Sequence, residues 1–413
     1  MRIPRLPHRP PRLLAACAAA AVAGAVVAGC GSGASPAVPQ GLSGSVAGVP
    51  GNSHYAAENA AAATVLTPAA GSFLAGRTTV TMLGSTTPVN GDINPYAIWP
   101  VTTTAGSVSA GDVLVDNFNN ASNNQGTGTT IVDLHPGGRL TVFAQLPRQV
   151  SGCPGGVGLT TAMVQLKTGW VIVGSLPSAT GRLATAGAGC LLVLSPTGQL
   201  ASTISGPYLD GPWDATVSDN GRVATLFVTS TLVGLTSHSS AAAQVSQGDV
   251  VRITLSESRS AAPKVTGETT IASGFGERPD AAAFVRGPTG LALGSSGTLY
   301  VADNLGNRIV SIPDALSRTT SAGTGRTLSQ GGQLANPLGM VLAPDGDLLV
   351  ANATNGKNVE ITPAGRQVGE YYADDSIGQE PPGNGDLFDL AINQAGTGVL
   401  FVNDGTNALE VLH

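Results

Sequence analysis

Two aspartates occupy matching positions in a repeated pattern of this sequence and could bind a cation together. Asp214 is the fourth residue of the run GPWD at 211–214, and Asp389 is the fourth residue of DLFD at 386–389. Hard cations such as Ca²⁺ bind several oxygen ligands, so two carboxylates could begin such a site. The alternative, which the sequence favours, is that each aspartate caps a turn or pairs locally.

Large apolar side chains stand one position earlier in four copies of the same pattern: Tyr96, Trp213, Leu338 and Phe388. If the fold brings them together, they could form an apolar funnel that binds a partner loop or a small ligand. The alternative is plain packing at the inner rim of the fold. We count these four residues and the two aspartates as the candidate ligand-binding set.

The sequence contains no other convincing catalytic set. Its histidines do not recur at equivalent places in the repeats, which argues against a histidine-rich metal cluster. No Gly-x-Ser-x-Gly nucleophile motif, P-loop or dinucleotide fingerprint is present. The five histidines are His8, His54, His135, His238 and His413.

A repeated unit positions the candidate residues. Each copy has an opening strand, a tight turn such as Asp345-Gly346, a very apolar second strand, an alternating third strand, and a turn into a fourth strand. Asn-Gly and Asp-Gly tolerate the positive φ that such turns need, and fully apolar strands are typical of sheets packed on both faces. The openings are NPYA (94–97), GGVG (155–158), GPWD (211–214), GPTG (287–290), NPLG (336–339) and DLFD (386–389).

Six openings predict an all-β, six-bladed β-propeller. The sixth copy ends after its third strand, so we expect an upstream strand at about 78–83 to complete the last blade beside 408–412 and protect its edge. Asp214 and Asp389, in repeats three and six, would then face each other across the central channel.

The composition fits this architecture and limits the partners. Only 11% of residues are charged, 42% are hydrophobic, and there are 56 glycines, which suits a turn-rich β protein. The net charge is −6, whereas a nucleic-acid-binding surface is basic. We therefore expect no nucleic-acid partner, and an unknown protein or small molecule as the ligand.

The fourth repeat resembles a known family. Its segment LYVADN at 299–304, followed by Asn307-Arg308-Ile309, is similar to the NHL-repeat consensus. The resemblance implies a six-bladed propeller but no single function, since fold does not determine function.

The blade pattern also resembles gluconolactonase-like propellers, which hold a divalent cation at the channel mouth. In that group a cation-binding acid typically occupies the middle of a Pro-Asp-Gly opening. Here the equivalent position holds no carboxylate; its occupants are Tyr96, Val157, Trp213, Thr289, Leu338 and Phe388. We therefore expect a binding or protein-interaction module without a cofactor. The alternative is a lactonase-like hydrolase with a channel cation such as Ca²⁺, held partly by Asp214 and Asp389.

The N-terminus resembles a bacterial lipoprotein signal. Arginines precede an uncharged Ala/Val/Leu stretch at 13–28, which ends in Val27-Ala28-Gly29-Cys30. The resemblance implies that 1–29 is a signal peptide and that Cys30 is lipidated. The protein would then be exported and anchored to the cell membrane or outer membrane. An ordinary secretory signal cleaved near Ala28 and an uncleaved hydrophobic anchor are the alternatives. The segment 30–63 is predicted to be a flexible linker and 64–413 the propeller.

Two cysteines lie in the body of the chain. Cys153 and Cys190 flank the first strands of the second repeat. In an exported protein they are expected to form a disulfide, with two buried free thiols as the alternative.

Overall fold

The computed structural model describes residues 66–413 except 233, 236–243, 281–282 and 376–379. The chain divides into two units, Met1–Val49 and Pro50–His413, and every described residue belongs to the second. The expected signal peptide (1–29) and linker (30–63) lie outside the described residues. Within the described part, no helix has the length and apolar character needed to cross a membrane.

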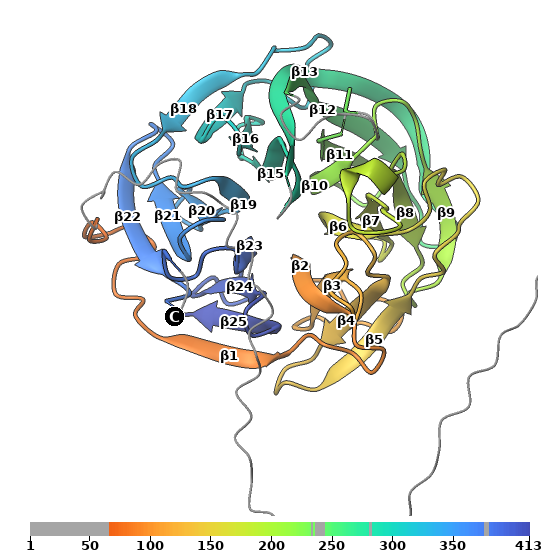
Figure 1. Cartoon of the computed structure of the whole chain (residues 1–413), viewed down its shortest axis with the longest axis horizontal. Helices are drawn as coiled ribbons and strands as arrows, with labels where there is room; N and C mark the ends of the chain where they lie inside the picture. The colour runs from red at the N-terminus through yellow and green to blue at the C-terminus, as the bar shows by residue number, and fades with distance from the viewer. Residues whose placement is uncertain (1–65, 233, 236–243, 281–282, 376–379) are drawn as a thin grey trace, which may run out of the picture. The chain divides into compact units, whose positions relative to one another are not determined.

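The described unit is an all-β propeller whose sheets are arranged around a central axis (Figure 1). Four of its sheets have four strands each, and neighbouring strands within them are antiparallel. In the order of pairing these sheets contain β2 (Ile93–Pro100), β3 (Val113–Asn119), β4 (Thr130–Leu134) and β5 (Leu140–Gln145); β15 (Pro288–Leu293), β16 (Leu299–Asp303), β17 (Arg308–Ile312) and β18 (Arg326–Gln330); β19 (Pro337–Leu342), β20 (Leu348–Asn352), β21 (Lys357–Ile361) and β22 (Gln367–Tyr372); and β1 (Val80–Ser85), β25 (Ala408–Leu412), β24 (Val399–Asn403) and β23 (Leu387–Ile392).

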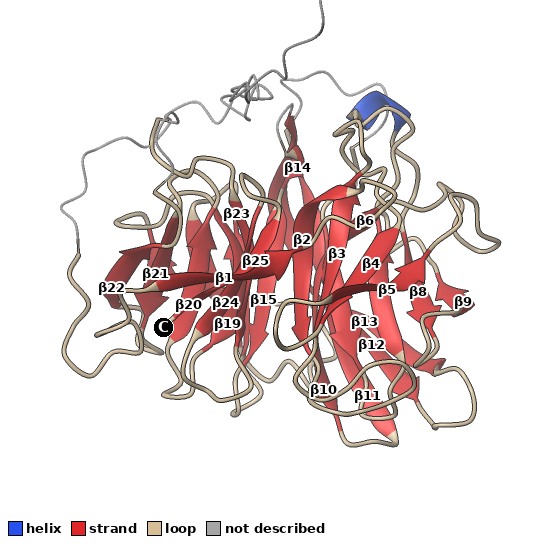
Figure 2. Cartoon of the chain, turned by 90° about the horizontal axis from the view of Figure 1, so that it is seen from below, coloured by secondary structure: helices blue, strands red, loops and turns tan. Residues whose placement is uncertain are grey.

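The second and third repeats share one nine-stranded sheet, so six repeats form five sheets instead of the six separate ones expected. A single parallel pairing, between Thr161 of β6 and Asp214 of β10, joins the two repeats. The strands are β6 (Leu159–Gln165), β7 (Val171–Ser175), β8 (Cys190–Leu194), β9 (Leu200–Ile204), β10 (Pro212–Asp219), β11 (Val223–Ser230), β12 (Val245–Ser256), β13 (Lys264–Asp280) and β14 (Phe284–Arg286). A short 3₁₀ helix, η1 (Leu183–Thr185), lies at the same end of the sheets as β14 (Figure 2).

Six strands line the axis: β2, β6, β10, β15, β19 and β23 (Figure 1). We call these the inner strands. Each inner strand has a shift in register against its neighbour near its start, at the opening run identified in the sequence or, in β6, directly after it. Such irregularities leave backbone groups out of the ladder, and those groups need other partners. Proline begins several of these strands, where no N–H is required.

The predicted closing strand is confirmed. β1 pairs antiparallel with β25, from Val80 opposite Leu412 to Ser85 opposite Ala408. The pairing covers the free edge of the last repeat, as the sequence argument required. An N-terminal segment and the C-terminal strand therefore share one sheet.

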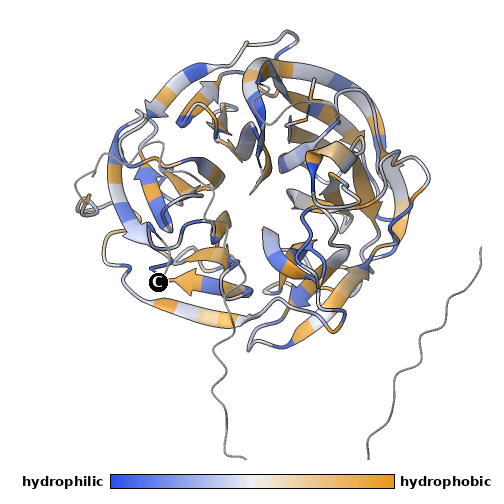
Figure 3. Ribbon diagram, viewed as in Figure 1, coloured by the Kyte–Doolittle hydropathy of each residue, from blue (hydrophilic) through white to orange (hydrophobic). Residues whose placement is uncertain are grey.

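Most residues of the second strands are buried, as expected. All residues of β3, β7, β20 and β24 are buried. Outer strands such as β13 and β22 instead alternate in hydropathy along their length (Figure 3). The propeller core is therefore formed mainly between neighbouring sheets.

The expected disulfide is confirmed. Cys153 and Cys190 are bonded, and their Cα atoms are 5.4 Å apart. Cys190 begins β8, and Cys153 lies in the loop that precedes β6. The bond therefore ties the entry of the second repeat to its third strand.

Candidate functional site

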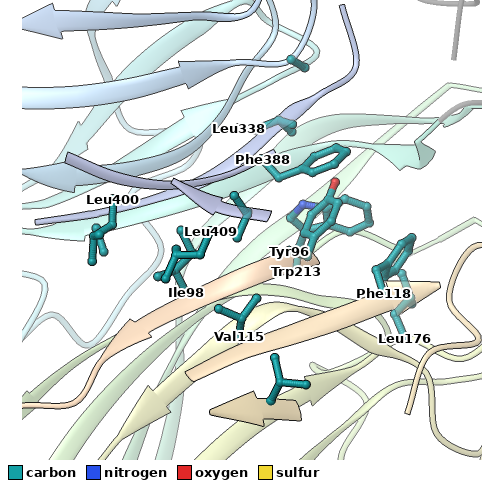
Figure 4. Packing of buried hydrophobic residues seen from close by; sticks show 14 of the residues in the cluster. Tyr96, Ile98, Val115, Phe118, Leu176, Trp213, Leu338, Phe388, Leu400 and Leu409 are labelled. Carbon is teal, nitrogen blue, oxygen red and sulfur yellow. The ribbon is translucent and has the colours of Figure 1, made fainter. Parts of the chain in front are cut away.

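The four large apolar residues of the openings meet on the axis, where they close it. Tyr96 stacks on Phe388 with ring centroids 4.1 Å apart, and its ring meets that of Trp213 edge-on at 6.0 Å (Figure 4). These three residues and Leu338 are between 2% and 5% exposed. The expected funnel is therefore filled by its own side chains at the end of the channel where the inner strands begin.

A cavity of about 350 Å³ lies along the same axis, toward the end where the inner strands finish. Its lining runs from the two candidate aspartates to Pro100 and the exposed Thr102, so it reaches solvent at that end. Among the lining residues, all of them described, Asp214 and Asp389 alone are ionisable. The lining is Ile98, Trp99, Pro100, Thr102, Met163, Asp214, Ala215, Thr216, Leu291, Ala292, Leu293, Met340, Val341, Leu342, Asp389, Leu390, Ala391 and Ile392.

Each aspartate ties its own inner strand to the next repeat. Asp214 Oδ2 accepts the N–H of Leu291 at 2.7 Å, and its Oδ1 accepts that of Ala215 at 2.6 Å. Asp389 repeats the arrangement, because its Oδ2 accepts from Ile98 N at 3.1 Å and its Oδ1 from Leu390 N at 2.8 Å. These amides lie at or beside the register shifts of the inner strands. The carboxylates therefore satisfy backbone donors that the ladder leaves free.

The environment of the two carboxyls changes their protonation. Burial, followed by the charge of Asp389, raises the pKa of Asp214 well above its usual range. Burial also raises the pKa of Asp389 to about 7, although the N–H groups of Ile98 and Leu390 favour its ionised form. The cavity therefore contains two carboxyls whose pKa values are raised by burial, that of Asp389 to about 7.

The sequence did not point to a third buried aspartate, which lies close enough to Asp389 to be affected by its charge. Asp116 is fully buried on β3, and its Oδ1 accepts the N–H of Ala97 at 2.9 Å. Its Oδ2 is buried without a hydrogen-bond partner. Burial, with a contribution from Asp389, raises the pKa of Asp116 well above its usual range. The available signal was an acid inside the otherwise apolar strand VLVD at 113–116.

Close approach of the inner strands explains the small residues at the aspartate position of other repeats. A Cβ on Gly290 would lie 2.1 Å from the carbonyl oxygen of Leu338, and one on Gly339 would lie 2.6 Å from Asp389 Cα. Contacts this short are impossible for a side chain. Asp214 and Asp389 therefore stand in two of the places where the ring leaves room for a carboxyl.

The cavity does not fit a resident hard cation. Ca²⁺ takes six to eight oxygen ligands. All four carboxylate oxygens of Asp214 and Asp389 already accept backbone N–H groups. Thr102 and Thr216 supply the only other side-chain oxygens among the described lining residues. This set of donors is too small to hold a hard cation in the channel.

Comparison with known proteins shows which solved structures share this fold. No family model matches the sequence, and no curated protein matches it. The structure is similar to a gluconolactonase from Xanthomonas campestris, with a TM-score of 0.52 and 13% identity over 84% of this chain and 93% of that one. It is also similar to the calcium-binding protein regucalcin from Agrobacterium tumefaciens, with a TM-score of 0.51 and 13% identity over 85% and 95% of the two chains.

A luciferin-regenerating enzyme is a further structural neighbour, with a TM-score of 0.50 and 11% identity over 81% of this chain and 94% of that one. At these identities the likeness is one of fold. It supports the gluconolactonase-like propeller architecture that the blade pattern implied.

Proposed function

We propose that this protein is a lactonase-like hydrolase that opens a small, largely aliphatic lactone in the channel cavity. One observation carries the proposal: two buried carboxyls, both with raised pKa values, line one apolar cavity. Such pairs are suited to acid–base catalysis at neutral pH. The gluconolactonase among the structural neighbours supports the choice of a lactone.

The reaction would use the two aspartates in turn. Ionised Asp389 takes a proton from a water molecule as the water oxygen bonds to the lactone carbonyl carbon. The ring C–O bond then breaks, and protonated Asp214 donates its proton to the leaving oxygen. A proton passes from Asp389 back to Asp214, and the product is an open hydroxy acid. Because the lining is mostly aliphatic, a lactone with an alkyl chain should be preferred over a sugar lactone.

A binding module without turnover is the second candidate. It is favoured by the hydrogen bonds of Asp214 and Asp389, since every oxygen of the two carboxyls has a structural role. In that case the cavity would hold a small apolar molecule, and the aspartates would serve only to join neighbouring repeats.

Hydrolysis of alkyl and sugar lactones of graded size by the intact protein tests the proposal. We expect turnover of alkyl lactones that EDTA leaves unchanged, and a loss of about 100-fold or more in kcat for Asp389→Asn and Asp214→Asn. Asp345→Asn, at an exposed position outside the cavity, should keep activity. Thermal melting would check that each variant folds.

The outcomes separate the two candidates. Lactone binding by calorimetry without turnover would favour the binding module. Turnover that survives both aspartate substitutions would remove the proposed chemistry, and the absence of both binding and turnover would remove both functions.

We also infer a six-bladed, NHL-like ring and export as a lipoprotein. Counting the nine-stranded sheet as two blades joined by one parallel pairing gives six, in agreement with the six openings. Export is supported by the disulfide, because such bonds persist in oxidising compartments. The partner would then be the membrane, through lipid on Cys30.

A further inference from the structure

Three ionisable side chains of the first repeat form a compact cluster away from the channel aspartates. Asp112 precedes β3, Asp133 lies in β4, and His135 follows β4 in the turn toward β5. His135 Nδ1 lies 3.0 Å from Asp112 Oδ1, and His135 Nε2 lies 3.7 Å from Asp133 Oδ2. One donor atom from each residue lies within 4.8 Å of the donor atoms of the other two. That separation is about twice a metal–ligand distance, so one ion can reach all three.

One oxygen of this cluster has no partner. Asp133 is 2% exposed, and its Oδ1 is buried without a hydrogen bond. A buried carboxylate oxygen that lacks a donor is costly, so the site favours a ligand that brings positive charge. The His135 side chain is 15% exposed, which leaves a path from solvent to the buried acids.

The fifth repeat provides an internal comparison. Asp347 and Glu360 occupy the positions equivalent to Asp112 and Asp133, and with Asp345 they form a second acidic group. Glu360, however, uses both oxygens, because Oε1 accepts the N–H of Phe73 at 2.6 Å and Oε2 that of Leu74 at 2.8 Å. At this blade position, the acid of the fifth repeat has both oxygens hydrogen-bonded to backbone N–H groups. The acid of the first repeat keeps one oxygen without a donor and lies beside a histidine.

We propose that Asp112, Asp133 and His135 form a binding site for a divalent transition metal of the Zn²⁺ class. Imidazole together with carboxylates is a donor set that such ions accept in tetrahedral geometry. Two carboxylates also balance the charge of the ion. The fourth position would be taken by water or by Thr141, whose Oγ1 lies 2.9 Å from His135 Nε2.

Metal binding would fix a loop at the open end of the cavity. Asp112 ends the segment 101–112, which begins at Val101 and includes the cavity residue Thr102. Val101 N donates to Asp112 O at 2.9 Å, and Ser109 N donates to Asp112 Oδ2 at 2.7 Å. An ion held by Asp112 would therefore tether this segment to β4. The site is independent of the proposed hydrolysis, which uses no cation.

Equilibrium dialysis of the intact, chelator-treated protein against ZnCl₂ tests the site, with bound metal measured by elemental analysis. We expect one equivalent of zinc per chain, and an affinity that falls by about tenfold or more in His135→Gln and Asp133→Asn. Cobalt substituted for zinc should give the visible absorption of a tetrahedral ion with nitrogen ligation.

Three comparisons make the result decisive. His413→Gln controls for surface histidine binding and Asp345→Asn for the second acidic group, and both should bind zinc like the wild type. The positive charge of Arg139 acts on Asp133 and would repel a cation bound there, so Arg139→Gln is expected to bind zinc more tightly. No stoichiometric zinc, or zinc binding unchanged in a folded His135→Gln variant, would overturn the proposal. If Asp133→Asn does not fold, His135→Gln and the cobalt spectrum still test the site, because the His135 side chain is partly exposed.

Discussion

The aspartates of the channel lie where the inner strands lose their regular pairing. The sequence placed Asp214 and Asp389 correctly within the openings, because a repeated motif makes an unusual residue visible. The sequence could not show which groups bind these carboxylates, because the donors Leu291 and Ile98 belong to the adjacent repeats. Asp116 and Asp133 were missed for a related reason. Each stands alone in an apolar strand, and only three-dimensional contacts show what surrounds it.

Replacing Asp389 with Asn is expected to change how stability depends on pH. Burial raises the pKa of Asp389 to about 7 in the folded protein, from 3.8 for the unperturbed group. Between about pH 4 and 7 the folded state therefore holds a proton that the unfolded state has lost, so wild-type stability falls as pH rises through this range. Asp389→Asn lacks this pH-dependent contribution to stability. It also removes the negative charge that contributes to the raised pKa of Asp214 and Asp116.

Urea unfolding of both proteins at pH 5 and pH 8 measures the effect. The advantage of wild type over Asp389→Asn should shrink from pH 5 to pH 8, by at most about 3 kcal/mol. The exposed Asp345→Asn variant serves as the matched control. Parallel stability profiles for wild type and Asp389→Asn would mean that this carboxyl titrates normally in the folded state.

At the scale of elements, the strand pattern of the sequence predicted the structure well. Apolar second strands, tight turns and the closing strand near 78–83 were all predicted from local residues, because hydrophobic alternation and turn chemistry are local signals. The parallel pairing of Thr161 with Asp214 was not predicted. It depends on how closely two inner strands approach, which the pattern of either repeat alone does not encode.

The segment before β1 depends on one buried side chain of the fifth repeat. Glu360 is fully buried and accepts the N–H groups of Phe73 and Leu74. In Glu360→Gln an amide NH₂ would face one of these donors, so one hydrogen bond is lost and buried donors are left without acceptors. We expect a loss of about 1–3 kcal/mol in the free energy of unfolding.

Hydrogen exchange locates this effect. Amides of residues 66–85 should exchange faster in Glu360→Gln, while those of β16 and β17 should change little. Asp345→Asn, in the same acidic group, is the control. Exchange that increases equally in every sheet would show that Glu360 stabilises the whole propeller instead of anchoring this segment.

At the scale of the whole described unit, ring closure joins distant parts of the chain. β1 completes the sheet of β23, β24 and β25, so residues near 80 and near 412 are neighbours. The propeller fold and its closing strand could be read in the sequence. The filled axis could not, because side-chain size alone does not distinguish an open funnel from Tyr96, Trp213 and Phe388 packed against one another.

We propose that Cys30, which precedes the described residues, determines the location of the molecule in the cell. If the resemblance to a lipoprotein signal is correct, lipid on Cys30 anchors the propeller to a membrane and leaves it outside the cytoplasm. Cys30→Ser should then release the protein from the membrane fraction, because no lipid can be attached. Cys17→Ser, within the segment expected to be removed, should leave anchoring unchanged. Fractionation of cells producing each form, with mass spectrometry of the mature N-terminus, measures both. A Cys30→Ser protein that stays in the membrane fraction like the wild type would instead indicate an uncleaved hydrophobic anchor, and the N-terminus would then precede Cys30.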